Sequence, residues 1–167
     1  MRGRDLAVAA LIAAMYAALV AALPMISFLL WQVRIADALL MLSTVLGWPA
    51  VVGVTLGCFI GNLTAPWGST ALILIDATMG SLANFVASYI AYKVAYRRGV
   101  AYKLAAAAIE VGVISVIVGS YLKYLLLWAF NVDLPLTLSI LGVLPGSFIA
   151  IGVLGTALAI ALEKRVT

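Results

Sequence analysis

Six polar side chains lie within long apolar stretches of the sequence, and their types suit hydrogen bonding rather than covalent chemistry. They are Arg34, Asp37, Asn62, Asp76, Asn84 and Lys123. Carboxylates and amides recognise N–H and C=O groups on the edge of a small planar solute. Trp31 and Trp128 add aromatic faces on which such a solute can stack. These residues predict a site for a flat, hydrogen-bonding small molecule.

Residues that commonly carry catalysis are missing. Histidine is absent and Cys58 is the single cysteine, so neither an internal disulfide nor a thiolate metal cluster is available. No G-x-x-x-x-G-K-[ST] motif occurs, so the chain cannot itself supply a P-loop ATPase. The carboxylates are scattered, whereas a metal-dependent membrane enzyme needs them clustered. We predict no catalytic residue, no metal and no cofactor in this chain, and a small membrane enzyme is the disfavoured alternative.

The composition places the protein in a membrane. Of its 167 residues, 66% are hydrophobic and 10% are charged, against roughly 45–50% and 25% in soluble proteins. There is too little polar surface to cover a globule in water, so the excess apolar surface must face lipid. The length leaves no room for a separate soluble domain, and we expect residues 1–167 to form one transmembrane domain.

Hydropathy and turn-forming residues divide the chain into helices. About 20 apolar residues cross a bilayer, and turns are expected at residues 47–49 and 65–69. The prediction is an all-α bundle of six spans, over residues 6–30, 35–46, 50–64, 70–93, 101–129 and 136–162. The second and third spans are short. Either neighbouring helices shield them or the bilayer thins around them.

Basic residues orient the bundle. They cluster at Arg2 and Arg4, at Lys93, Arg97, Arg98 and Lys103, and at Lys164 and Arg165. Lys and Arg near span ends mark the cytoplasmic side. Six spans bring all three clusters and both termini to that side, whereas five would strand the last cluster outside. Orientation therefore accounts for the net charge of +4, and we expect no nucleic-acid partner.

The six-span topology places the polar side chains of the predicted site in the outer half of the membrane. Such groups cost about 2.5–3.5 kcal/mol each at mid-helix, so Asp76 and Asn62 should face a pocket or each other. Two alternatives remain open: Arg34 and Lys123 can snorkel to the headgroups, and the tryptophans can form an interfacial belt. Glu110 lies alone in the inner half, which disfavours a proton or ion pathway.

Small residues recur at helical spacing on the first predicted span. Ala10, Ala14, Ala18 and Ala22 form one stripe. Such a stripe lets another helix approach closely, either within the bundle or on a partner protein. A glycine ladder at Gly53, Gly57 and Gly61 indicates internal contacts of the third span.

Three segments resemble the QueT group among the substrate-binding (S) subunits of energy-coupling-factor (ECF) transporters. Residues 32–39 are similar to that group's Q-x-R-x-[SA]-[ED]-A-L, and residues 53–63 to its G-x-x-x-G-C-x-x-x-N-L. Residues 76–83 resemble its D-x-x-x-G-S-L-A run. Asp37 stands where Glu is usual and Asn84 where Thr is usual, which bears on the ligand more than on the fold.

The resemblance implies an S subunit in the cytoplasmic membrane that captures a queuosine precursor of the 7-deazaguanine type from outside. It would deliver this ligand by toppling against a transmembrane scaffold subunit, with ATP used by two partner ATPases. The alanine stripe would then meet the scaffold. An S subunit for another vitamin or nucleobase, and a stand-alone secondary transporter, are the alternatives.

The resemblance also places Arg34, Asp37, Asn62 and Asp76 in the ligand site. There, Asp37 or Asp76 would accept ring N–H groups or pair with an aminomethyl cation, and Asn62 would both donate and accept. Arg34 or Lys123 would donate to the ring carbonyl, and Trp31 or Trp128 would stack on the ring.

Overall fold

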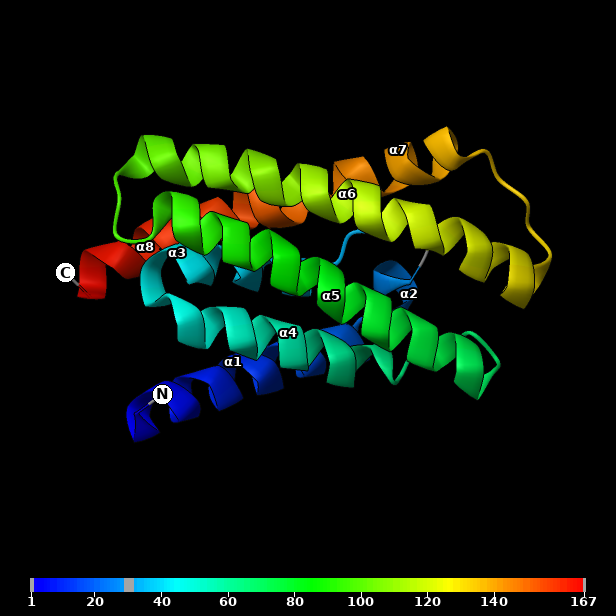
Figure 1. The fold of residues 1–167 in the computed structure, drawn as a ribbon, viewed down its shortest axis with the longest axis horizontal. Coiled ribbons are helices and arrows are strands. Elements are labelled where there is room, and N and C mark those ends of the chain that lie inside the picture. The colour runs from blue at the N-terminus through cyan, green and yellow to red at the C-terminus, as the bar shows by residue number, and fades with distance from the viewer. Residues whose placement is uncertain (1, 29–31, 167) are drawn as a thin grey trace.

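The computed structural model describes residues 2–28 and 32–166. Within these ranges the chain is helical and contains no strand. The elements are α1 (Gly3–Ala22), α2 (Pro24–Ser27), η1 (Ile35–Leu42), α3 (Ser43–Leu46), α4 (Trp48–Asn62), α5 (Thr70–Ala95), α6 (Val100–Phe130), α7 (Leu136–Ser147), η2 (Phe148–Gly155) and α8 (Thr156–Val166). They pack side by side into one elongated bundle (Figure 1).

Four helical rods in the described part of the chain are long and apolar enough to cross a membrane. They are α1, α5, α6 and the rod Leu136–Arg165, which joins α7, η2 and α8. Ile35–Leu46 and Trp48–Asn62 are shorter apolar helices. The expected all-helical membrane bundle is confirmed, and the count of six spans stays a prediction.

The first helix ends earlier than predicted. A continuous helix over residues 6–30 is wrong, because α1 stops at Ala22 and a separate short helix, α2, begins at Pro24. Proline has no backbone N–H to donate and its ring clashes with the preceding turn. The chain therefore turns at Leu23, where φ is −125° and ψ is 50°.

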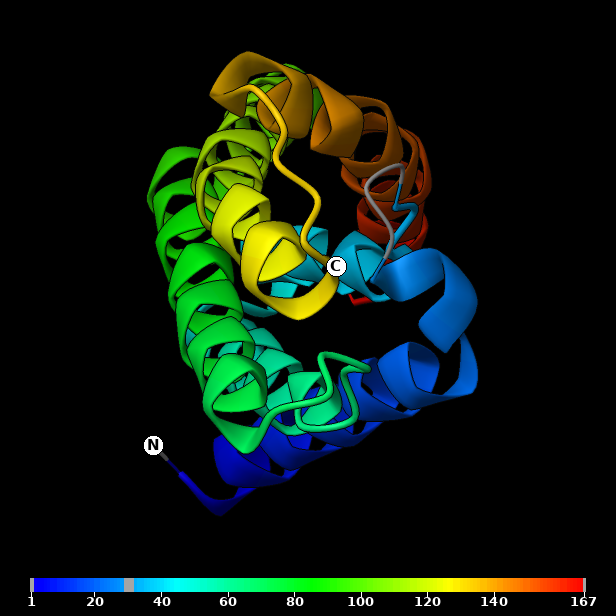
Figure 2. The same ribbon diagram turned by 90° about the vertical axis from the view of Figure 1, so that its right-hand side faces the viewer.

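A tightly wound segment occupies the middle of the bundle. η1 is a 3₁₀ helix in which residues 36–42 are all buried, and it contacts α1, α4, α5, α6, η2 and α8. The end-on view shows this segment, in cyan, surrounded by the other helices (Figure 2). With its α-helical end, α3, it spans about 22 Å. Neighbouring helices thus shield this short element from lipid. Of the two alternatives for the short second span, shielding and bilayer thinning, the structure shows shielding.

Glycine allows α4 to pack directly on α1. A Cβ at Gly57 would lie 2.6 Å from the Cβ of Tyr16, and one at Gly53 would lie 2.8 Å from the carbonyl oxygen of Ala9. Separations this short are not tolerated, so any larger residue would push the helices apart. The predicted internal role of the glycine ladder is confirmed at these two positions.

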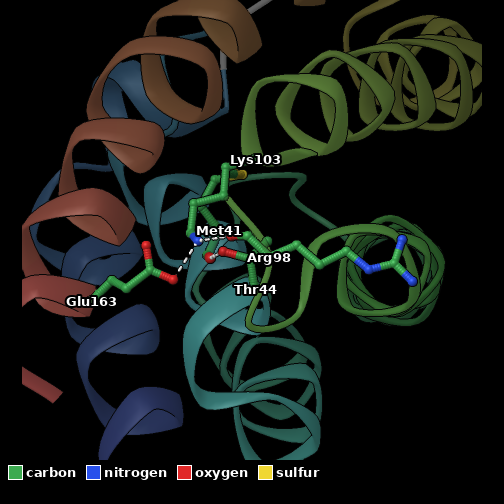
Figure 3. Close-up of polar contacts among 5 residues, drawn as sticks. All are labelled: Met41, Thr44, Arg98, Lys103 and Glu163. Carbon is green, nitrogen blue, oxygen red and sulfur yellow. Dashed lines mark hydrogen bonds and ion pairs between the residues drawn. The ribbon is translucent and has the colours of Figure 1, made fainter. Parts of the chain in front are cut away.

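All three basic clusters lie at one end of the bundle, which we call the basic end. The start of α1, the α5–α6 turn and the end of α8 are all found there (Figure 1). At this end the buried ammonium of Lys103 lies 2.7 Å from Glu163 Oε1 and donates to the carbonyl of Arg98 at 2.7 Å (Figure 3). One side chain thereby joins α6, α8 and the α5–α6 turn.

Candidate binding site

Arg34 enters the bundle from the extended segment before η1 and is buried. Its Nε and Nη2 donate to the carbonyl of Ser27, at 3.4 and 3.2 Å. The guanidinium carbon lies 5.3 Å from the centre of the Phe28 ring, a cation–π distance. The side chain therefore points inward, and the alternative that it snorkels to the headgroups does not hold.

Asp37 lies in the first turn of η1 and is buried. Its Oδ1 accepts a hydrogen bond from the hydroxyl of Tyr16, a fully buried residue of α1. Hydrogen bonds to a carboxylate are stronger than those between neutral groups. This bond therefore ties α1 to the wall of the site.

Asp76 and Asn62 lie together where α4, α5 and α6 meet. The carboxylate of Asp76 accepts from Trp67 Nε1 at 2.8 Å and from the hydroxyl of Tyr121 at 2.9 Å. Asn62 Nδ2 donates to the backbone carbonyl of Asp76 at 3.1 Å. Gly80 makes room for this contact, because a Cβ there would lie 2.6 Å from Asn62 Nδ2. Of the two arrangements expected for Asp76 and Asn62, a shared pocket or mutual contact, the structure shows contact between them.

A small internal cavity adjoins Arg34 and Asp37. It is lined by Gln32, Arg34, Asp37, Asn84, Ile114, Val118, Val143 and Ser147. Its volume of about 10 Å³ suffices for about one water molecule, whereas small-molecule pockets are roughly 300–1,000 Å³. This cavity by itself is therefore too small for a planar bicyclic ligand.

The structure brings together only part of the predicted site. Arg34, Asp37 and Asn84 line the cavity, whereas Asn62 and Asp76 are not among its lining residues. Lys123 Nζ lies 3.3 Å from Asp133 Oδ1 near the end of α6, and Trp128 is 58% exposed. Neither of these two lines the Arg34–Asp37 cavity, because hydropathy gives depth but not the direction a side chain faces. Trp31 lies outside the described residues.

Several site residues were missed in the sequence. Gln32 and Ser147 line the cavity, and Tyr16, Trp67 and Tyr121 hold the carboxylates. Gln32 belongs to the Q-x-R motif, which could have indicated its place at the site. No such indication existed for the aromatic residues, because a phenol or indole within an apolar span looks like part of an interfacial belt.

Some buried polar atoms of the described residues have no hydrogen-bond partner. They are Ser43 Oγ, Asn62 Oδ1, Asn84 Nδ2, both carboxyl oxygens of Glu110, and Ser115 Oγ. An unsatisfied buried polar group costs about 1–3 kcal/mol. The interior thus holds unused hydrogen-bonding capacity in the same bundle that carries the Arg34–Asp37 cavity.

The alanine stripe faces away from the bundle. Ala10, Ala14, Ala18 and Ala22 are exposed, whereas Ala9 and Ala13 on the neighbouring stripe are buried against α4. Internal packing therefore uses the second stripe and leaves the first one free.

The comparisons with known proteins agree with this architecture. A family model described as QueT transporter matches residues 6–164, which is nearly the whole chain. No curated protein and no solved structure shows significant similarity to it. The match indicates transport rather than catalysis, in a multi-pass bundle with four apolar rods of membrane-spanning length. The chain belongs to the QueT transporter family.

Proposed function

We propose that this protein is the substrate-binding subunit of an ECF-type importer and captures a queuosine precursor of the 7-deazaguanine type from outside the cell. The family match over residues 6–164 supports a transporter. The observation that carries the proposal is the cavity that Arg34, Asp37 and Asn84 all line, because Asn84 Nδ2 is buried there without a partner. These groups complement the polar edge of a guanine-like ring.

Different residues at the cavity recognise different groups on the polar edge of the ring. The guanidinium of Arg34 donates to the ring carbonyl, and the carboxylate of Asp37 accepts from the ring N–H and amino groups. Charge-assisted bonds of this kind contribute about 1.5–3 kcal/mol each. Asn62 and Asp76 form the next layer, in which the free Oδ1 of Asn62 accepts from the ligand once the cavity opens.

Delivery requires partners. The subunit topples against a transmembrane scaffold, and two partner ATPases hydrolyse the ATP. The exposed stripe Ala10, Ala14, Ala18 and Ala22 is the surface that meets the scaffold, because small side chains allow close helix contact in lipid. The protein lies in the cytoplasmic membrane with its basic end, and both termini, on the cytoplasmic side.

Two measurements test this function. Calorimetry with the purified chain should detect binding of a 7-deazaguanine precursor, and mass spectrometry should find such a molecule co-purifying. Uptake in cells should need the scaffold and both ATPases. A vitamin or other nucleobase in the mass spectrum would reassign the ligand, and uptake without the ATPases would favour a stand-alone secondary transporter.

A further inference from the structure

The proposed function assigns no role to Glu110. It lies within α6, is fully buried, and neither oxygen of its carboxyl group has a hydrogen-bond partner. The carboxylates of Asp37 and Asp76 differ, because each accepts at least one bond from a phenol or an indole. An unpaired acidic side chain is among the costliest groups to keep inside a membrane protein. Its presence indicates a partner that arrives from outside the chain.

The position of Glu110 on α6 links it to the cavity. Ile114 and Val118 line the cavity, and Glu110 precedes them by one and two helical turns. Residues four apart lie on the same face of a helix. Glu110 therefore lies on the same face of α6 as these lining residues, one turn nearer the basic end than Ile114.

The neighbouring helix carries a second unpartnered group at a similar depth. α5 and α6 run antiparallel, and the bond between Tyr121 and Asp76 fixes their register. Glu110 lies about 16 Å inward of Tyr121 and Asn84 about 12 Å inward of Asp76, at 1.5 Å per residue. Asn84 Nδ2 is buried without a partner and lines the cavity. Two unused polar groups thus lie within about one helical turn of each other in depth.

We propose that Glu110 binds a protonated amine of the ligand, beneath the level at which Arg34 and Asp37 hold the polar ring edge. The inference rests on the proposed function and assigns a ligand group to one residue. An alkylammonium offers three N–H donors and a compensating charge, so it satisfies a carboxylate that the protein leaves bare. The site then selects an amine-bearing 7-deazaguanine over the same ring with a neutral substituent.

Two ligands that differ only in the 7-substituent test this role. Calorimetry on the purified chain would compare 7-aminomethyl-7-deazaguanine, a cation, with 7-cyano-7-deazaguanine, which is neutral. We expect Glu110→Gln to weaken binding of the amine at least about tenfold and binding of the nitrile less than about threefold. Asp133→Asn is the matched control: it makes the same change from carboxyl to amide at an exposed site and should change neither affinity.

The possible outcomes separate the two proposals. Equal loss for both ligands, or no loss for either, would overturn the role of Glu110 while leaving the proposed function intact. A wild-type chain that binds neither ligand would overturn the proposed function, and this role with it. Thermal unfolding checks that each variant is folded. Glu110→Met, which is apolar and of similar volume, must show the same selective loss if the glutamine variant does not fold.

Discussion

At the scale of single residues, Asp76 lies where α4, α5 and α6 meet, and Asn62 donates a hydrogen bond to its backbone carbonyl. Trp67 and Tyr121 each donate to the Asp76 carboxylate, so a neutral amide at this position would present N–H to at least one donor. Asn62 keeps its Oδ1 free. The pair therefore supports the site from one side and offers it an acceptor.

We expect Asp76→Asn and Asn62→Ala each to weaken ligand binding at least about tenfold in the purified protein. The first change removes the charge that Tyr121 and Trp67 are arranged around, and the second removes the free acceptor. Isothermal titration calorimetry measures both. Ser120→Ala is the control, because its hydroxyl bonds only within its own helix, to the Val116 carbonyl. Unchanged affinity in both variants would end the assignment of this pair to the site.

Residue types and depth were predictable, but side-chain direction was not. Arg34, Asp37 and Asn84 stood out in the sequence because polar groups at membrane depth are costly, and they do line one cavity. Lys123 matched them in type and depth, yet it extends to Asp133 near the end of its helix. Only the packing of one helix on another decides which way a side chain faces.

At the scale of elements, α1 presents two different faces. Its buried face packs on the glycines of α4, and its exposed face carries the stripe of four alanines. We expect Ala14→Trp to abolish uptake in cells that contain the scaffold and ATPases, because the indole prevents close helix contact. Ligand binding by the purified variant should be unchanged. Val116→Trp, at an exposed position of α6, is the control and should transport normally. Uptake that survives Ala14→Trp would assign the stripe to lipid contact alone.

The ion pair between Lys103 and Glu163 at the basic end joins two elements, α6 and α8. Glu163→Met leaves the buried ammonium of Lys103 without its carboxylate, and we expect a loss of at least about 1.5 kcal/mol in stability. Lys103→Met combined with Glu163→Met should recover part of that loss, since an apolar pair has no charge to desolvate. Thermal unfolding in detergent measures the three proteins. A double variant less stable than Glu163→Met would contradict this account.

Element ends were predictable wherever a turn residue marked them. The helix predicted over 101–129 is observed over Val100–Phe130, and Gly47, with a φ of +70°, ends α3 as expected. Pro24 was the overlooked signal in the first span. The 3₁₀ winding of η1 had no signal of its own, because a segment that is apolar on all sides shows no period from which its winding can be inferred.

At the scale of the whole molecule, we predict that the basic end faces the cytoplasm. In a Cys58→Ser background, a cysteine placed at Arg98 should be protected from a membrane-impermeant thiol reagent applied to intact cells, and one at Asp133 should react. Both positions are exposed, and they lie at opposite ends of α6, which is about 46 Å long. Permeabilised cells, in which both must react, provide the control. The reverse pattern would place the basic end outside.

The bond between Tyr16 and Asp37 gives α1 a consequence for the whole molecule. Ala14 and Ala18 face outward on the side of the helix opposite Tyr16, so a single helix, about 10 Å across, separates the proposed docking face from the cavity wall. A displacement of α1 caused at the alanine stripe therefore also moves Tyr16 at the cavity wall, and the reverse holds as well. Guest occupancy and subunit association should therefore be thermodynamically linked, each altering the equilibrium constant of the other by the same factor.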